Sequence, residues 1–114
     1  MIKAEHYAKR IVNMYKYLVD VKRETTLSKQ VLRSGTSIGA NVAESRRAQS
    51  VADFVSKLSI ALKEAEETGY WLKTPYGGDY LTMAELASIN ADNEELIKIL
   101  VCSIKTVKQK SGRL

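Results

Sequence analysis

The sequence predicts an all-α protein, folded as an antiparallel four-helix bundle in up-down-up-down order. Apolar residues recur at spacings of three and four in four stretches, and no stretch shows the alternation typical of a half-buried strand. The connections between these stretches are short, which favours antiparallel neighbours. A chain of 114 residues has the length of one domain. We therefore expect a single domain over residues 1–114, with helices at about 3–22, 27–47, 51–73 and 83–110.

The first predicted helix, residues 3–22, carries its apolar side chains on one broad face. Ile11 and Leu18 belong to this face, whereas His6 lies on the opposite, polar side. A short turn, "RETT", follows. Thr26 then has the residue type and the position expected of an N-cap for the second helix.

The second predicted helix, residues 27–47, contains the unusual stretch "SGTSIGANVAES" at 34–45. Its apolar stripe continues through this stretch, which indicates that the glycines do not break the helix. Each glycine inside a helix costs about 1 kcal/mol relative to alanine, so their presence needs a reason. Gly35, Gly39 and Ala43 are four residues apart and share one side. Small side chains there predict the close approach of another backbone.

A polar stripe runs beside these small residues, and two interpretations of this surface of the helix remain open. In the first, the stretch packs against helices of its own chain, which satisfy its polar groups. In the second, it also forms a subunit interface. The candidate packing or interface residues are Ser34, Gly35, Ser37, Ile38, Gly39, Asn41, Ala43 and Glu44, together with Glu67, which can pair with a basic group of a neighbouring helix or subunit.

Capping patterns mark the starts of the last two predicted helices. Ser50 and Asp53 have the spacing of a capping box, and Thr82 and Glu85 have the same spacing. The third helix is expected to end near residue 73, because the residue before Pro75 disfavours helical geometry. The fourth helix reaches about residue 110.

Charge is segregated along the chain, whose net charge is +5. Residues 1–49 hold ten Lys or Arg against four Asp or Glu, and residues 50–95 hold three against nine. Residues 96–114 hold five basic residues and no acidic one. In an antiparallel bundle the ends of the second and fourth helices lie at the same pole. The nucleic-acid-binding candidates at this pole are Arg46, Arg47, Lys105, Lys108, Lys110 and Arg113, because clustered Lys and Arg bind phosphates without reading sequence.

Catalytic chemistry finds little support in the sequence, and we expect no enzyme, no cofactor, no metal and no small-molecule substrate. The single histidine, His6, is expected in solvent, and bundle metal sites need Glu-x-x-His repeats that are absent here. The single cysteine, Cys102, has no histidine nearby in sequence and is expected to be packed or half-buried. One cysteine and the lack of an apolar leader or membrane span predict a cytoplasmic protein.

The segment "LRSGTSIGANVAES" at 32–45 resembles the signature of a bacterial family of small four-helix bundle proteins. The family is named for the intervening sequences of large-subunit rRNA genes. Matching positions include Leu32, Arg33, Ser37, Ile38, Asn41, Ala43 and Glu44, whereas Val42 replaces the usual isoleucine and Ser45 the usual glycine. The segment "FVSKLSIALKEAEETGYWLK" at 54–73 is similar to the third helix of the family.

The resemblance implies a four-helix bundle that assembles into a homopentameric ring, and it does not imply an enzyme. Accessory proteins of diversity-generating retroelements are distantly similar; they bind nucleic acid and a reverse transcriptase. We therefore expect an oligomeric binding module whose preferred ligand is RNA or DNA. The alternative is a structural or adaptor oligomer that binds another protein, such as a reverse transcriptase or another nucleic-acid enzyme, without touching nucleic acid itself.

Overall fold

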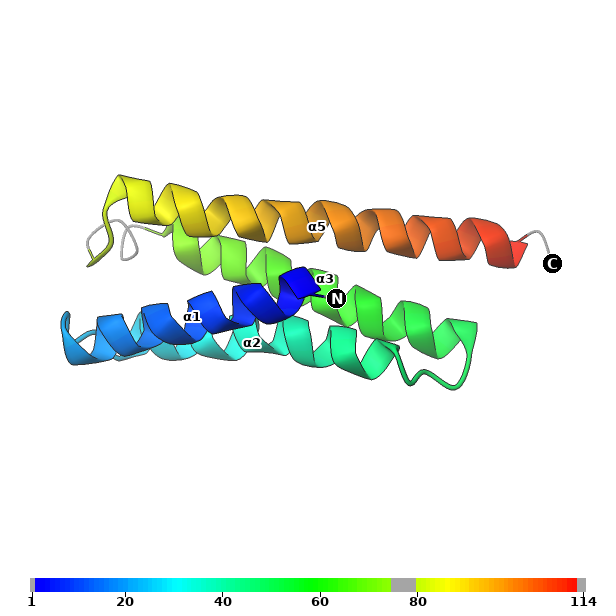
Figure 1. The fold of residues 1–114 in the computed structure, drawn as a ribbon, viewed down its shortest axis with the longest axis horizontal. Helices are drawn as coiled ribbons and strands as arrows, with labels where there is room; N and C mark the ends of the chain where they lie inside the picture. Colours follow the sequence, from blue (N-terminus) through cyan, green and yellow to red (C-terminus); the bar gives the residue numbers. More distant parts are fainter. Residues whose placement is uncertain (1, 75–79, 113–114) are drawn as a thin grey trace.

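The computed structural model describes residues 2–74 and 80–112, and every regular element within these ranges is a helix. Helix α1 spans Ile2–Asp20, α2 spans Thr26–Ser45, α3 spans Val51–Lys73 and α5 spans Met83–Gly112. Consecutive helices run in opposite directions in an elongated molecule of 53 × 21 × 20 Å (Figure 1). The predicted all-α class is confirmed. In the described part of the chain, no helix is both long enough and apolar enough to cross a bilayer.

The turn between α1 and α2 is set by two neighbouring residues. Arg23 has a φ of 58°, a value that a right-handed helix does not contain, and α1 ends at Asp20, two residues before its predicted end. The next residue, Glu24, is buried although it is acidic. Its backbone N–H donates to the carbonyl of Leu18 at 2.9 Å, which holds the turn against the last turns of α1.

The start of α2 is capped by Glu24 and not by Thr26, so the predicted N-cap is wrong. The Glu24 carboxylate accepts hydrogen bonds from the backbone N–H groups of Thr26, Leu27 and Ser28 at 2.6–2.8 Å. Thr26 is the first helical residue, and Thr25 stands at the cap position without a side-chain hydrogen bond. A carboxylate reaching these N–H groups does the same work as a capping side chain and also favours the positive end of the helix dipole.

The other helix starts follow the predicted caps. The Ser50 hydroxyl accepts from the Asp53 N–H at 3.0 Å, and the Thr82 hydroxyl accepts from the Glu85 N–H at 3.1 Å. The Glu85 carboxylate accepts in turn from the Thr82 N–H at 2.9 Å. Hydrogen bonds from Thr82, above all from its backbone N–H, hold the pKa of Glu85 below its ordinary value.

Two further helix ends differ from prediction by two residues, as the end of α1 does. Helix α2 ends at Ser45, where the chain turns toward α3, and α5 continues to Gly112. The predicted bounds of the third helix, 51–73, agree with α3. Pro75, which was expected to end it, lies outside the described residues.

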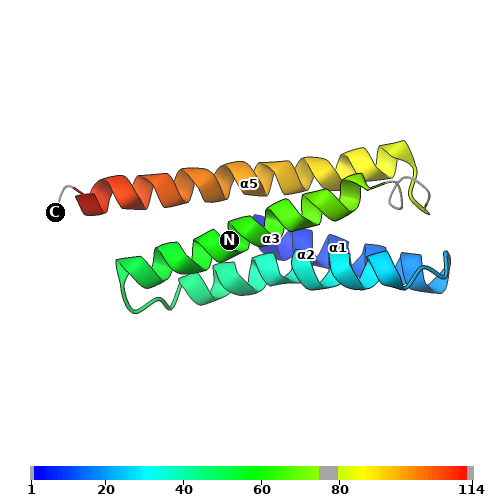
Figure 2. The ribbon, with the colours of Figure 1, turned by 180° about the vertical axis from the view of Figure 1, so that it is seen from behind.

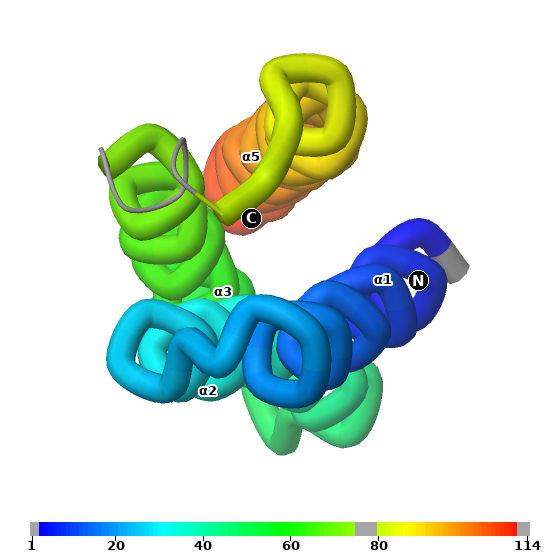
Figure 3. Tube along the Cα trace, turned by 90° about the vertical axis from the view of Figure 1, so that its left-hand side faces the viewer, coloured from blue at the N-terminus to red at the C-terminus, as the bar shows by residue number. Residues whose placement is uncertain are grey.

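The core forms where the apolar stripes meet. Its buried members come from all four helices: Ala4, Tyr7, Ile11, Leu27, Val31, Ile38, Val42, Leu58, Ala61, Ala65, Leu72, Ile89, Leu96 and Leu100. The helices do not contact one another equally. Helix α2 packs along both α1 and α3, and α3 packs along α5, whereas α1 and α5 make few contacts. Seen end-on, the trace of α1 lies beside that of α2 and apart from that of α5 (Figure 3), and residues of α1 and α5 line a groove between them.

Gly35 and Gly39 serve packing within the chain. A Cβ atom at Gly35 would lie 2.8 Å from Cγ2 of Ile11, so the absence of a side chain lets α1 approach α2 closely. At Gly39 the nearest atoms are the Ala4 carbonyl oxygen at 3.6 Å and the Ala8 Cβ at 3.8 Å. Ala43 is exposed, which corrects its expected place in the packed stripe. The close contact therefore ends at Gly39.

Candidate nucleic-acid interface

The predicted basic residues gather at one end of the molecule because α2 and α5 both finish there. The turn from α2 to α3 and the last turns of α5 lie at the same end in Figure 1, with α3 beginning between them in Figure 2. We call the five described candidates at this end, Arg46, Arg47, Lys105, Lys108 and Lys110, the basic end. The sixth candidate, Arg113, lies outside the described residues.

The basic end is exposed and largely uncompensated by acidic groups. All five of its side chains belong to exposed residues. Within the described part of the chain, four of them form no ion pair, and Arg46 has one contact, to Glu5 at 3.8 Å. By contrast, Arg33 on α2 pairs with Glu67 and with Glu64 on α3. The hydrogen bond to Glu67 is the main reason that the pKa of Arg33 is raised, so Glu67 has its partner within the chain.

The five basic side chains do not form one continuous row. Lys105 and Lys108 are three residues apart and line a shallow groove of about 320 Å³ with Leu62, Val101 and Ile104. Lys110 follows Lys108 by two residues, which turns it by about 200° around the helix axis. The arginines follow the end of α2, and α3 begins between α2 and α5 (Figure 2). The basic end thus presents cations in several directions around one pole.

The polar stripe of α2 mostly finds partners within its own chain. Ser34 is fully buried and its hydroxyl accepts from the Thr68 hydroxyl of α3 at 2.8 Å. The Asn41 side-chain amide donates to the Ser37 carbonyl at 2.9 Å and lies 3.2 Å from its hydroxyl.

The polar stripe of α2 ends at Glu44, which is exposed and pairs with Lys57 at 3.0 Å. Ile38, on the apolar stripe, is buried in the core. These contacts support the interpretation of packing within the chain. Among the candidate residues of α2, Ala43 and Glu44 are the exposed ones and remain for the subunit interface, which stays a prediction.

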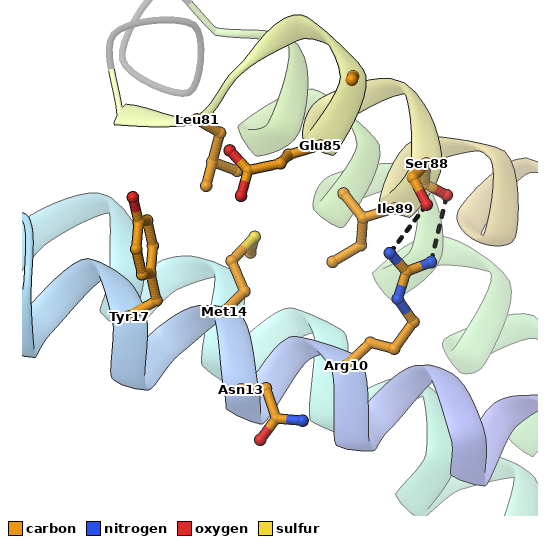
Figure 4. Close-up of a pocket in the computed structure, with 9 residues that line it drawn as sticks. Arg10, Asn13, Met14, Tyr17, Leu81, Glu85, Ser88 and Ile89 are labelled. Carbon is orange, nitrogen blue, oxygen red and sulfur yellow. Dashed lines mark hydrogen bonds between the residues drawn. The ribbon is translucent and has the colours of Figure 1, made fainter.

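A groove of about 570 Å³ lies between α1 and α5, at the end opposite to the basic end, and the sequence did not reveal it. Figure 4 shows Met14 of α1 and Ile89 of α5 projecting into it, with Arg10 at its wall. The Arg10 guanidinium contacts Asp92 at 2.6 Å, the Ser88 hydroxyl at 3.0 Å and the Ser88 carbonyl at 3.3 Å. Its donors are therefore already engaged across the groove.

Titratable groups elsewhere form no candidate metal site in the described ranges. No group of three or more His, Cys, Asp or Glu side chains in residues 2–74 and 80–112 lies where it could hold a metal ion. His6 is exposed, as predicted. Tyr7 is buried, and burial, followed by the charge of Asp92, raises the pKa of its hydroxyl well above the ordinary range. Cys102 is exposed, so the expectation of a packed thiol is wrong.

These features define a class: a small antiparallel four-helix bundle, open along α1 and α5, with an uncompensated cationic end. The chain belongs to the 23S rRNA-intervening sequence protein family, whose profile matches residues 1–102. This membership confirms the resemblance carried by the α2 signature.

A solved relative has the same fold. The crystal structure of a protein of unknown function from the S23 ribosomal protein family of Bacteroides thetaiotaomicron, at 1.70 Å resolution, is 53% identical in sequence. The match covers 90% of this chain and 95% of that one, with a TM-score of 0.87. Among curated proteins, none matches this chain significantly.

Proposed function

We propose that the protein is a non-enzymatic, oligomeric binding module whose basic end binds nucleic acid, with RNA as the preferred ligand. The observation that carries this proposal is the gathering of exposed, unpaired cations at one end of the bundle. Along the body of the bundle, Arg33, Lys57 and Arg10 have acidic partners, whereas isolated exposed lysines such as Lys9, Lys16 and Lys29 have none among the described residues. At the basic end, Arg47, Lys105, Lys108 and Lys110 have none among the described residues.

Unpaired exposed cations are suited to phosphate groups. Neutralising phosphates with Lys or Arg releases counterions, so binding of this kind is tight at low salt and independent of sequence. Assembly into the homopentameric ring that the family resemblance implies would repeat the basic end five times around one axis and strengthen its field. The family description connects its members with 23S rRNA, and structured RNA is therefore the first ligand to test.

The non-enzymatic part of the proposal rests on how the polar groups of the α1–α5 groove are used. Arg10, Asp92 and Ser88 bind one another and so tie the two helices together. A cytoplasmic location is proposed with it, since the lone cysteine is exposed and suits a reducing compartment.

Retention on immobilised structured RNA at rising salt tests the proposal. We expect retention at about 50 mM salt and an affinity lower by about 10³-fold at about 200 mM if six phosphates are contacted. The triple variant Lys105→Glu, Lys108→Glu, Lys110→Glu should lose retention. Its matched control reverses three exposed lysines elsewhere, Lys9→Glu, Lys16→Glu and Lys29→Glu. This control should bind the RNA more tightly than the triple variant of the basic end does. Equal loss in both variants would show that net charge matters and the basic end does not.

The alternative function is an adaptor oligomer that binds another protein, such as a nucleic-acid enzyme, without contacting nucleic acid. Exposed large apolar side chains on α3 and α5, among them Val51, Tyr70 and Val101, favour it. This alternative predicts no RNA retention at low salt. Light scattering of the purified protein tests the assembly: five times the monomer mass supports the ring, and a monomer at micromolar concentration contradicts it.

A further inference from the structure

Helices α1 and α5 border the same grooves but differ in length. Helix α1 has 19 residues and α5 has 30, which correspond to about 28 Å and about 45 Å at 1.5 Å per residue. Lys3, near the start of α1, forms an ion pair with Glu95, and this pair marks where α1 begins alongside α5. Figure 1 shows α5 continuing well past the N-terminus of α1. The rest of α5 therefore has α3 beside it and no α1.

A second groove begins beyond the N-terminus of α1. It has a volume of about 550 Å³ and lies between Phe54 of α3 and the side of α5 that carries Ile99, Ser103 and Val107. On α5, residues 88, 92 and 95 face α1, and residues 99, 103 and 106 continue the same row at spacings of three and four. The groove therefore continues the side of α5 that faces α1.

The floor of this groove is apolar. Phe54 is partly buried and packs against the core, and Ile99 and Val107 are also half-buried. A neighbouring helix would cover these side chains in the way that α1 covers the core further along. Water covers them in the isolated chain, which is unfavourable in proportion to the apolar area.

The rim of the groove carries one basic side chain and, in the described part of the chain, no acidic one. Lys98 lines the groove, whereas Lys105 and Lys108 line the separate groove beside Leu62. Among the described residues Lys98 has no ion-pair partner, since the acidic side chains of α5 that pair with α1 and α3 all lie before residue 96. An occupant with apolar side chains on one face and carboxylates on its flanks would satisfy both floor and rim.

The geometry points to a docking site for an acidic amphipathic helix of a partner protein, lying end to end with α1 against Phe54 and α5. The lining from Lys98 to Val107 extends about 15 Å, which accommodates about ten residues of helix. This is the helix-in-groove mode of recognition, in which residues at i, i+3, i+4 and i+7 enter the groove. A nucleic-acid backbone fits less well, because it would leave the apolar floor uncovered. The site is separate from the basic end, because none of its lining residues belongs to that end.

The single cysteine provides a direct reporter, since Cys102 is exposed and lines the groove. The probe is a synthetic 14-residue helical peptide with leucines on one face and glutamates elsewhere. Bound peptide should slow alkylation of Cys102 about fivefold or more at saturation, because the covered thiol reacts only when the complex opens. A peptide of the same composition with its leucines distributed around the helix should give no protection. The control protein carries Cys102→Ser with Ser59→Cys, which moves the thiol to an exposed position on α3, and should show no protection either.

Charge reversal at the rim gives an independent readout by fluorescence anisotropy of the labelled peptide. Lys98→Glu should weaken binding about five- to tenfold, and Lys63→Glu, an equal charge change at an exposed position on α3, less than about twofold. Three results would overturn the proposal: no protection of Cys102 at millimolar peptide, equal protection by single-stranded RNA, or protection that rises with protein concentration in the absence of peptide. The last result would assign the groove to a second copy of this chain.

Discussion

The two long sides of α1 are built on different principles. Toward α2, Ile11 is fully buried and meets the backbone of Gly35 directly. Toward α5, the contacts are two ion pairs at the surface, Arg10 with Asp92 and Lys3 with Glu95. Both pairs border open grooves between the two helices.

This difference teaches which neighbour holds α1 in place. Burying an apolar side chain such as Ile11 contributes about 1.5–3 kcal/mol, whereas exposed ion pairs contribute about 0–1 kcal/mol each. Helix α1 is therefore stabilised mainly by α2, and its ion pairs to α5 fix its register more than its stability. The five predictions below test this contrast by denaturation at one fixed protein concentration, because assembly would add a concentration-dependent contribution.

The largest effect is expected at the α2 side, for Ile11→Ala. Removing this buried side chain should lower the free energy of unfolding by about 2–5 kcal/mol, since it deletes apolar contacts and leaves a cavity. Urea denaturation followed by circular dichroism measures the change. Val12→Ala, a half-buried neighbour, is the control and should cost clearly less. A loss below 1 kcal/mol for Ile11→Ala would mean that α1 is not held through this contact.

Gly35→Ala should destabilise by about 1–3 kcal/mol, although alanine favours helix formation over glycine. The added Cβ would come within 2.8–2.9 Å of Cγ2 and Cγ1 of Ile11, so α1 must shift. The double variant with Ile11→Ala removes those atoms and should lose less stability than the two single variants together. Additive losses would place the strain somewhere other than at this contact.

Among the core residues of α1, Tyr7→Phe should raise stability by about 1 kcal/mol. The Tyr7 hydroxyl is buried without a hydrogen-bond partner among the described residues, and removing such a group relieves its desolvation penalty. The thermal midpoint and the urea midpoint should both increase. A decrease would reveal that a bound water or another group satisfies this hydroxyl.

Gly39→Ala should raise stability by about 0.5–1 kcal/mol, opposite in sign to the same change at Gly35. The new Cβ would lie 3.6 Å from the Ala4 carbonyl oxygen and 3.8 Å from the Ala8 Cβ, which are ordinary contacts. The helix then gains the propensity of alanine over glycine. Denaturation of the two alanine variants side by side is the measurement, and a shared sign would contradict the account of the two glycines.

The smallest effect is expected for Asp92→Asn, a loss of about 0.5 kcal/mol or less. The side chains of Arg10 and Asp92 are 32% and 35% exposed, and Arg10 keeps its contacts to Ser88 in the variant. Raising the salt concentration should reduce the difference between variant and parent further, because salt screens exposed charges. A loss of several kcal/mol would show that α5 holds α1 as firmly as α2 does.

The sequence was sufficient for the architecture because helix periodicity and capping residues are local signals. The apolar stripe of α2, the capping box of Thr82 and Glu85, and the bounds of α3 all follow from residues close together in the chain. The N-cap of α2 was missed because Glu24 reaches the helix start from outside the usual cap position.

Features that depend on the facing helix could not be read from one sequence. Gly35 and Gly39 have the same residue type and lie on the same side of α2, yet only the position of Ile11 distinguishes them. The same limit applies to the candidate sites. Antiparallel order was enough to place Arg46 and Lys108 at one pole, but the groove at Cys102 exists because α1 starts alongside Glu95, a relation between distant segments.

The buried carboxylate of Glu24 has a consequence for the order in which the protein is made. It fastens the beginning of α2 to a turn that already rests on the end of α1, so the first 45 residues can form a helical hairpin from neighbouring contacts alone. During synthesis this hairpin leaves the ribosome before α3 does, and we expect the later helices to pack against it.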